Sequence, residues 1–238
     1  MVRLYFILFS LTFSLLQAIS IDISLGDVIN FKQKLNVDID SNAESFSVRP
    51  KTHGFKSPQY YSLRLKNELM RGQKSHYIEM ELIHHKLYLE DGLPDYIKEF
   101  EFTDGYNLLM GNYSVRSKNI GLRIGFGALI VHPDITIQGP EVNLEQPLRI
   151  YEKGGGLIPI FGEDNGYYLT GLAHQLGVFA TKKINNKISG HIEAKVLGAW
   201  MLDPVVTKYR DDADNDRSLL IDISNLSIHL LAGISFGK

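Results

Sequence analysis

The fold is decided by residues 119–131, which read NIGLRIGFGALIV. Every second residue from Ile120 to Ile130 is apolar, whereas Arg123, Gly125 and Gly127 share the opposite set of positions. Successive side chains of a β-strand point to opposite faces, so a period of two predicts a strand with one apolar and one polar face.

The same alternation recurs along the chain. We predict eight strands, and most are longer than the roughly 5–6 residues usual in soluble sheets. Such lengths are typical of transmembrane strands that continue beyond the bilayer. The expected strands are 27–36, 58–70, 76–89, 97–115, 119–131, 167–183, 188–202 and 219–237.

The connections between these segments alternate between long and short. The second, fourth and sixth connections, 71–75, 116–118 and 185–187, are short, whereas the fifth runs from 132 to 166. Outer-membrane barrels have short turns at the periplasmic end and longer loops outside. The sequence therefore predicts an all-β fold, an eight-stranded antiparallel up-and-down transmembrane β-barrel.

The N-terminal segment predicts export. Arg3 precedes an apolar stretch, residues 4–16, and small residues follow at Ala18 and Ser20. A positive start, a short apolar core and small residues are typical of a cleaved signal peptide. We expect residues 1–20 to be removed, with cleavage after Ser20 or after Ala18, and residues 21–238 to form one domain.

Composition narrows the function classes. The formal net charge is −2, which gives no basic balance that would favour nucleic acid, and no cofactor is indicated. The chain has no cysteine, so disulfides and thiolate chemistry are excluded.

Periodicity alone leaves two environments open. In a soluble periplasmic barrel of the lipocalin kind the apolar face would point inward around a ligand, whereas in a membrane barrel it would meet lipid. The export signal and tyrosines near strand ends (Tyr60, Tyr61, Tyr88, Tyr96, Tyr106, Tyr113, Tyr167 and Tyr168) favour the membrane. Phe236, third from the end, is similar to the terminal aromatic residue read by the barrel-insertion machinery.

The arrangement of residues 27–238 resembles the small eight-stranded bacterial outer-membrane barrels, both the adhesion or scaffold type and the lipid A deacylase type. Segments 81–89, 104–109 and 127–133 are also similar to segments of a family of uncharacterised outer-membrane proteins. The resemblance implies a monomer in the outer membrane of a Gram-negative bacterium, in contact with lipid and lipopolysaccharide.

Charged residues on the polar faces are expected in the lumen. An eight-stranded barrel is just wide enough for side chains to fill it, so a solid core of ion pairs is favoured over a small pore. The expected lumen residues are Glu79, Glu81, Glu99, Glu101, Arg123, His191, Glu193 and Lys195.

Histidines are the first candidates for chemistry. Alternation places His85 in the lumen and His84 and Lys86 outside, where Lys86 and Tyr88 could meet lipopolysaccharide phosphates; a bulge near 82–83 would reverse this. A structural role is favoured over a catalytic one.

A lipid A-modifying acyl hydrolase is the alternative function. It would need a nucleophile, a base and an orienting carboxylate. The chain lacks the His-x-Ser pair of barrel deacylases, and Asp222 with Ser224 is the nearest assembly.

An acidic loop is the remaining candidate site. Asp212, Asp214 and Asp216 have the spacing that begins a calcium loop, but the required Gly and the later Glu are missing. A solvated loop is favoured over a metal site. The primary hypothesis is therefore a non-enzymatic outer-membrane barrel that serves envelope integrity or surface interaction through its loops.

Overall fold

A computed structural model describes residues 19–55, 59–150, 154–155, 158–160 and 167–237. The described chain is almost entirely β-structure, with one short 3₁₀ helix, η2 (Pro140–Val142). The predicted signal peptide lies outside these residues except for Ile19 and Ser20, which pair with Asn67 and Lys66. Both its removal and its cleavage site stay predictions.

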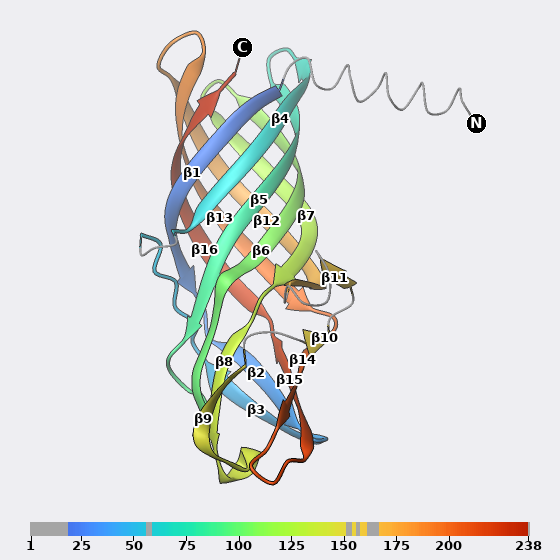
Figure 1. The fold of residues 1–238 in the computed structure, drawn as a ribbon. Coiled ribbons are helices and arrows are strands. Elements are labelled where there is room, and N and C mark those ends of the chain that lie inside the picture. The colour runs from blue at the N-terminus through green and yellow to red at the C-terminus, as the bar shows by residue number, and fades with distance from the viewer. Residues whose placement is uncertain (1–18, 56–58, 151–153, 156–157, 161–166, 238) are drawn as a thin grey trace, which may run out of the picture.

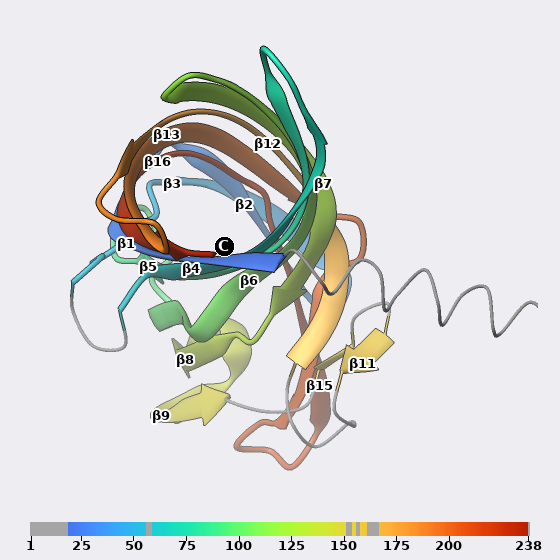
Figure 2. The same ribbon diagram turned by 90° about the horizontal axis from the view of Figure 1, so that it is seen from above.

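Eight strands form a closed antiparallel ring, which we call the cylinder (Figures 1 and 2). Each strand pairs with the next one in the ring, and the last pairs with the first, so the ring has no free edge. The ring strands are β1 (Ile19–Asn30), β4 (Tyr61–Arg71), β5 (Ser75–Leu89), β6 (Ile97–Ser117), β7 (Ile120–Val131), β12 (Tyr167–Lys183), β13 (Ile188–Met201) and β16 (Asn225–Phe236).

The prediction of eight antiparallel strands is confirmed, and six of the eight segments match a ring strand closely. The first strand was expected at 27–36, but β1 begins at Ile19. The start was missed because the alternation of Ile21, Ile23 and Leu25 with polar residues follows closely on the apolar segment 4–16 and is hard to separate from it in the sequence. The segment 219–237 covers two strands, of which only β16 belongs to the ring.

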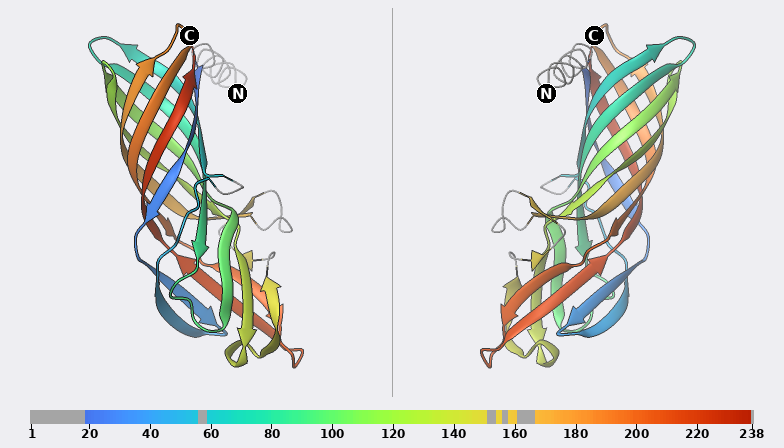
Figure 3. Two further views of the ribbon diagram at one scale, coloured as in Figure 1. Left: turned by 90° about the vertical axis from the view of Figure 1, so that its left-hand side faces the viewer. Right: turned by 90° about the vertical axis from the view of Figure 1, so that its right-hand side faces the viewer.

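The three short turns that join ring strands, 72–74, 118–119 and 184–187, lie at one end of the cylinder, together with the start of β1 and the end of β16 (Figure 1). We call this the turn end. The long connections leave from the opposite end and build an extension that continues the long axis (Figures 1 and 3). The predicted alternation of long and short connections is thus confirmed.

The extension consists of two groups of strands. One is a five-stranded sheet in the order β10-β14-β15-β2-β3, and the other continues β5 and β6 of the ring through β8 to β9. A further short strand, β11 (Ile158–Ile160), pairs with β12. The remaining bounds are β2 (Gln33–Ile39), β3 (Asn42–Val48), β8 (Asp134–Gly139), β9 (Leu144–Ile150), β10 (Gly154–Gly155), β14 (Val205–Arg210) and β15 (Asp216–Ile223).

The cylinder and the extension bury opposite kinds of side chain. In the cylinder, Asp22, Arg64 and Glu81 are buried while Ile23 and Leu63 beside them are exposed. In the extension, Val37 and Ile221 are buried and belong to one apolar core. The core also contains Leu35, Val48, Phe100, Phe102, Ile135, Ile137, Val142, Leu219 and Ile223.

Strand β6 runs through both environments on one inward face. Ser114 and Asn112 face inward in the cylinder, and Phe102 and Phe100 face inward in the extension. Where the cylinder and the extension meet, β6 has a bulge: His85 pairs with Tyr106 and Leu87 with Phe102, so one residue of β5 lies opposite three residues of β6. Within the bulge, Gly105 adopts a φ of 119°, which would strain any residue with a side chain.

The lumen prediction for Glu99 and Glu101 is therefore wrong. Glu99 is exposed and Glu101 half-buried on the outside of the extension. This part of β6 belongs to an apolar core, so its polar face is the solvated one.

The tyrosines near strand ends, which in the sequence favour a membrane, mostly do not lie on the outer surface. Tyr60, Tyr96, Tyr106 and Tyr168 are buried, and only Tyr61 and Tyr113 are exposed. A buried phenol needs a hydrogen-bond partner. Tyr60 finds one in His229, at 2.6 Å, and the Tyr106 hydroxyl donates to the Ile223 carbonyl.

Candidate functional site: the ionic interior of the cylinder

The centre of the cylinder is an ion-pair network around Arg64 on β4. Its guanidinium donates to Glu81 Oε1 at 2.7 Å, to Glu193 Oε2 at 2.9 Å and to Asp22 Oδ2 at 3.3 Å. Lys195 Nζ donates to the same Glu81 oxygen at 2.8 Å. Glu79 Oε2 is a fourth carboxylate partner, 3.5 Å from Arg64 Nε. Arg64 and these carboxylates come from four strands whose alternation turns the side chains inward, so the network ties together β4, β5, β13 and β1.

A second arginine extends the network toward β7. Arg123 Nε donates to Glu79 Oε2 at 2.6 Å, and its guanidinium lies over the Phe179 ring, 4.6 Å from the centroid. A Cβ on Gly121 would lie 2.3 Å from that ring, so only glycine leaves room for Phe179 here. The cationic and anionic groups of the network are equal in number: Arg64, Lys66, Arg123 and Lys195 face Asp22, Glu79, Glu81 and Glu193.

Glu81 is the most heavily bonded carboxylate. Besides the two cations it accepts hydrogen bonds from Ser62, from Asn112 at 2.9 Å and from Gln175 at 2.7 Å. Charges removed from water must be paired and hydrogen-bonded to be tolerated. Glu81 meets that requirement, and a cavity of about 10 Å³ lies beside the network, bordered by Arg64, Glu79 and His191. That volume is the size of one water molecule.

A layer of neutral polar groups lies between this network and the extension. The Tyr60 hydroxyl lies 2.6 Å from His229 Nδ1, and Ser227 Oγ lies 2.9 Å from His229 Nε2. Thr52 donates to the Lys86 carbonyl at 2.9 Å, so its oxygen accepts from His85 Nε2, 2.8 Å away. The rings of His85 and His229 meet edge to face at 5.0 Å. Beyond this layer the interior is apolar, starting with Leu87 and Phe102.

The structure brings six of the eight predicted lumen residues into the interior: Glu79, Glu81, Arg123, His191, Glu193 and Lys195. Sequence reasoning missed Arg64 and Asp22, which are central. Asp22 adjoins the predicted signal peptide. Arg64 was detectable by alternation, because Ser62, Arg64 and Lys66 occupy one face of a predicted strand.

The two histidines of the 84–85 pair point in opposite directions, as alternation predicts. His85 is buried in the interior, whereas His84 stacks on Tyr61 at 4.9 Å and bonds Asn107 Oδ1 at 2.8 Å on the outside. Lys86 was expected outside with Tyr88 but is buried, because it lies opposite the β6 bulge.

The candidate hydrolase residues serve other contacts. Asp222 accepts a hydrogen bond from Asn36 at 3.1 Å on the extension, and His85 bonds Thr52. No hydrogen bond joins Ser224 or Asp222 to a histidine among the described residues.

Ser–His contacts do form inside the cylinder: Ser227 with His229, and Ser24 and Ser235 with His191. All of these side chains are buried. The other ring nitrogen of His229 meets Tyr60, and both ring nitrogens of His191 meet serines, so neither histidine has a carboxylate in the orienting position of a triad.

The acidic loop is organised by Asp211. Its carboxylate accepts from the Asn143 side-chain amide at 2.9 Å and from the Asn215 backbone N–H at 2.9 Å, and these bonds hold the pKa of Asp211 well below its usual value. Asp214 and Asp216 pair with Arg210 instead of facing a common centre.

Asp212, the third carboxylate of the predicted calcium loop, accepts the Glu145 backbone N–H at 2.6 Å. Among the described residues no cluster of three or more His, Asp or Glu side chains could hold a metal.

Comparisons with known proteins give no family. No protein-family model matches the sequence, and no curated protein is significantly similar to it. Among solved structures, the outer membrane protease OmpT from Escherichia coli superposes with a TM-score of 0.48 and 10% identity, covering 93% of this chain and 97% of that one. A similarity at this level decides nothing about activity. Over the described residues, no helix is both long and apolar enough to cross a membrane.

Proposed function

We propose that the protein is a bacterial outer-membrane β-barrel whose cylinder spans the bilayer and whose extension is presented outside for surface interaction or envelope integrity. The closed ring has paired charges inside and aliphatic side chains outside. This inverted arrangement is the observation that carries the proposal.

The aliphatic belt surrounds the whole ring. Each strand contributes at least one large apolar side chain that is more than a third exposed, so no sector of the circumference is polar throughout. Examples, one from each strand, are Ile23, Leu63, Met80, Leu109, Ile124, Leu176, Ile192 and Leu230. Soluble monomers rarely expose contiguous apolar patches beyond a few hundred Å². A lipid environment removes that cost, and only a closed ring satisfies its own backbone there.

The interior argues against transport and against an apolar ligand. The ionic network leaves a water-sized cavity, and the apolar core of the extension closes the far side of the histidine layer. We therefore propose that the cylinder does not conduct ions and serves as a rigid support for the extension. A lipocalin-like binder would need an apolar chamber where Arg64 and Glu81 lie.

Reconstitution tests the membrane proposal. The purified chain should insert into phosphatidylcholine vesicles, migrate differently in gels before and after boiling, and keep the cylinder protected from added protease while the extension is cleaved. Planar bilayers containing it should show no channel steps. A chain that stays monomeric and folded in buffer without detergent would overturn the proposal.

The non-enzymatic part of the proposal has a separate test. Because Ser224 and Asp222 have no histidine partner among the described residues, lipid A from cells with and without the protein should have the same acyl chains by mass spectrometry. Loss of an acyl chain in cells with the protein would instead support the acyl hydrolase.

A further inference from the structure

The turn end carries an unpaired cluster of cations. Three turns, residues 68–76, 116–120 and 181–188, contain only one acidic residue, Glu68, which pairs with Arg71. Five exposed lysines remain, and none has an ion-pair partner among the described residues. We call them the lysine ring: Lys74, Lys118, Lys182, Lys183 and Lys187.

Several cations of the extension have acidic partners, whereas Lys34, Arg49, Lys98 and Lys208 have no ion-pair partner among the described residues. Arg210 pairs with Asp214 and Asp216, Arg217 pairs with Asp40, and Lys51 pairs with Glu90 at 2.8 Å. Acidic residues outnumber basic ones in the segments that build the extension. The lysine ring is therefore not a generic feature of this surface but a local excess of positive charge.

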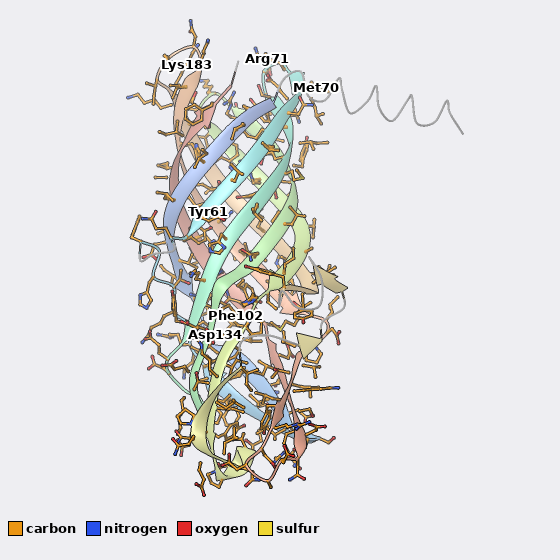
Figure 4. The ribbon with its side chains drawn as sticks, viewed as in Figure 1. Tyr61, Met70, Arg71, Phe102, Asp134 and Lys183 are labelled. Carbon is orange, nitrogen blue, oxygen red and sulfur yellow. The ribbon has the colours of Figure 1, made fainter. Side chains whose placement is uncertain are left out.

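The lysine ring also borders exposed apolar side chains. Leu69 and Met70 are 50% and 65% exposed beside Arg71, and Ile184 is 65% exposed next to Lys183. Figure 4 shows Met70, Arg71 and Lys183 together at the turn end. Apolar residues that reach into the turns indicate that the aliphatic belt continues to this end, so the lysines lie at the level of lipid headgroups rather than out in water.

We infer that the lysine ring binds anionic phospholipid headgroups of the leaflet at the turn end. This rests on the proposed function. Lysines near an anionic surface attract it through their charge, and salt weakens the attraction. Lysine is suited to this role because its flexible stem carries a compact charge outward from an apolar surface.

The experiment compares lipid selectivity in inserted protein. Spin-labelled phosphatidylglycerol and phosphatidylcholine are added in turn to vesicles containing the full chain, and electron spin resonance gives their relative association with the protein. We expect phosphatidylglycerol to be preferred by roughly threefold or more at low salt, with the preference shrinking at 1 M NaCl.

Two matched variants isolate the lysine ring. Changing all five lysines to glutamine should abolish most of the preference. Changing Lys34, Arg49, Lys98, Lys208 and Arg210 to glutamine removes as many cations from the extension and should leave the preference intact.

The outcomes separate the two proposals. Failure to insert into any vesicle overturns the membrane proposal itself. Insertion with equal association of both lipids, or an equal loss in both variants, overturns the headgroup inference alone. In that case an acidic soluble partner becomes the next explanation for the lysine ring.

Discussion

The cylinder and the extension share the continuous strands β5 and β6 but obey opposite rules of burial. In the cylinder the inward face is ionic and the outward face aliphatic, whereas in the extension Phe102 and Ile221 are inside and polar groups are outside. Under the proposed function the cylinder is surrounded by lipid and the extension by water, and the surrounding medium decides which face of a strand is buried. Alternation by itself does not tell which face of a strand, the polar or the apolar one, points inward.

The largest effect should come from breaking the ionic interior. Arg64→Leu leaves Asp22, Glu81 and Glu193 without their shared cation, and breaking a buried ion pair typically costs about 3–5 kcal/mol. The exposed pairs of Arg210 should contribute about 1 kcal/mol or less, so Arg210→Leu is the control. Urea unfolding in vesicles measures both; equal losses would mean that the two regions do not differ in this way.

A matched pair of phenylalanines tests the apolar faces. Phe102 is fully buried in the extension, whereas Phe126 is 67% exposed on the cylinder. Phe102→Ala should cost about 3–5 kcal/mol because it leaves a cavity. Phe126→Ala should cost much less, because the proposed function places the lost side chain in fluid lipid, where no cavity is left. Amide exchange around each site reports the local loss, and a larger effect at Phe126 would contradict the lipid-facing assignment.

A cation placed on the outer surface should destabilise the cylinder more than the extension, by a smaller amount than the changes above. Leu176→Arg puts a cation on the aliphatic belt and should destabilise the folded state in vesicles by about 2–4 kcal/mol if the site lies near the bilayer midplane. Ser45→Arg, on the exposed face of β3, should change stability by no more than about 0.5 kcal/mol. Similar small values for both would argue that Leu176 is in water.

Acid should loosen the extension locally and with the smallest effect. Hydrogen bonds from Asn143 and Asn215 lower the pKa of Asp211. Burial alone would raise the pKa of Asp40, but the Ser218 N–H and Arg217 outweigh it and lower that pKa too. A carboxylate with a lowered folded pKa stabilises fully above its unfolded value of about 3.9 and loses this as pH falls below it.

Exchange of the Ala213, Asn215 and Ser218 amides, which donate to these carboxylates, should therefore accelerate below that pH, relative to intrinsic exchange. In Asp211→Asn the pH dependence at Ala213 and Asn215 should flatten. An unchanged profile in that variant would assign the acid response to another group.

Much of the cylinder was predictable because alternation is local. Residues 119–131 and 188–201 contain their own evidence for strand, polar face and apolar face, and the short turns between strands fix antiparallel order. The inward positions of His191, Glu193 and Lys195 follow from the same pattern. Glu99 was misplaced because its strand passes from the ionic interior of the cylinder into the apolar core of the extension, and no local pattern in the sequence marks that boundary.

The sequence by itself determined that polar and apolar side chains alternate along each strand, that the strands follow one another in antiparallel order, and that the polar faces carry charges of both signs. Only the tertiary structure decided which charges meet, that Arg64 would be shared by carboxylates from β1, β5 and β13, and that four long connections would assemble a second core. The physical reason is distance along the chain. Strand periodicity is set by neighbours two residues apart, whereas ion pairs such as Arg64 with Glu193 join residues brought together only by ring closure.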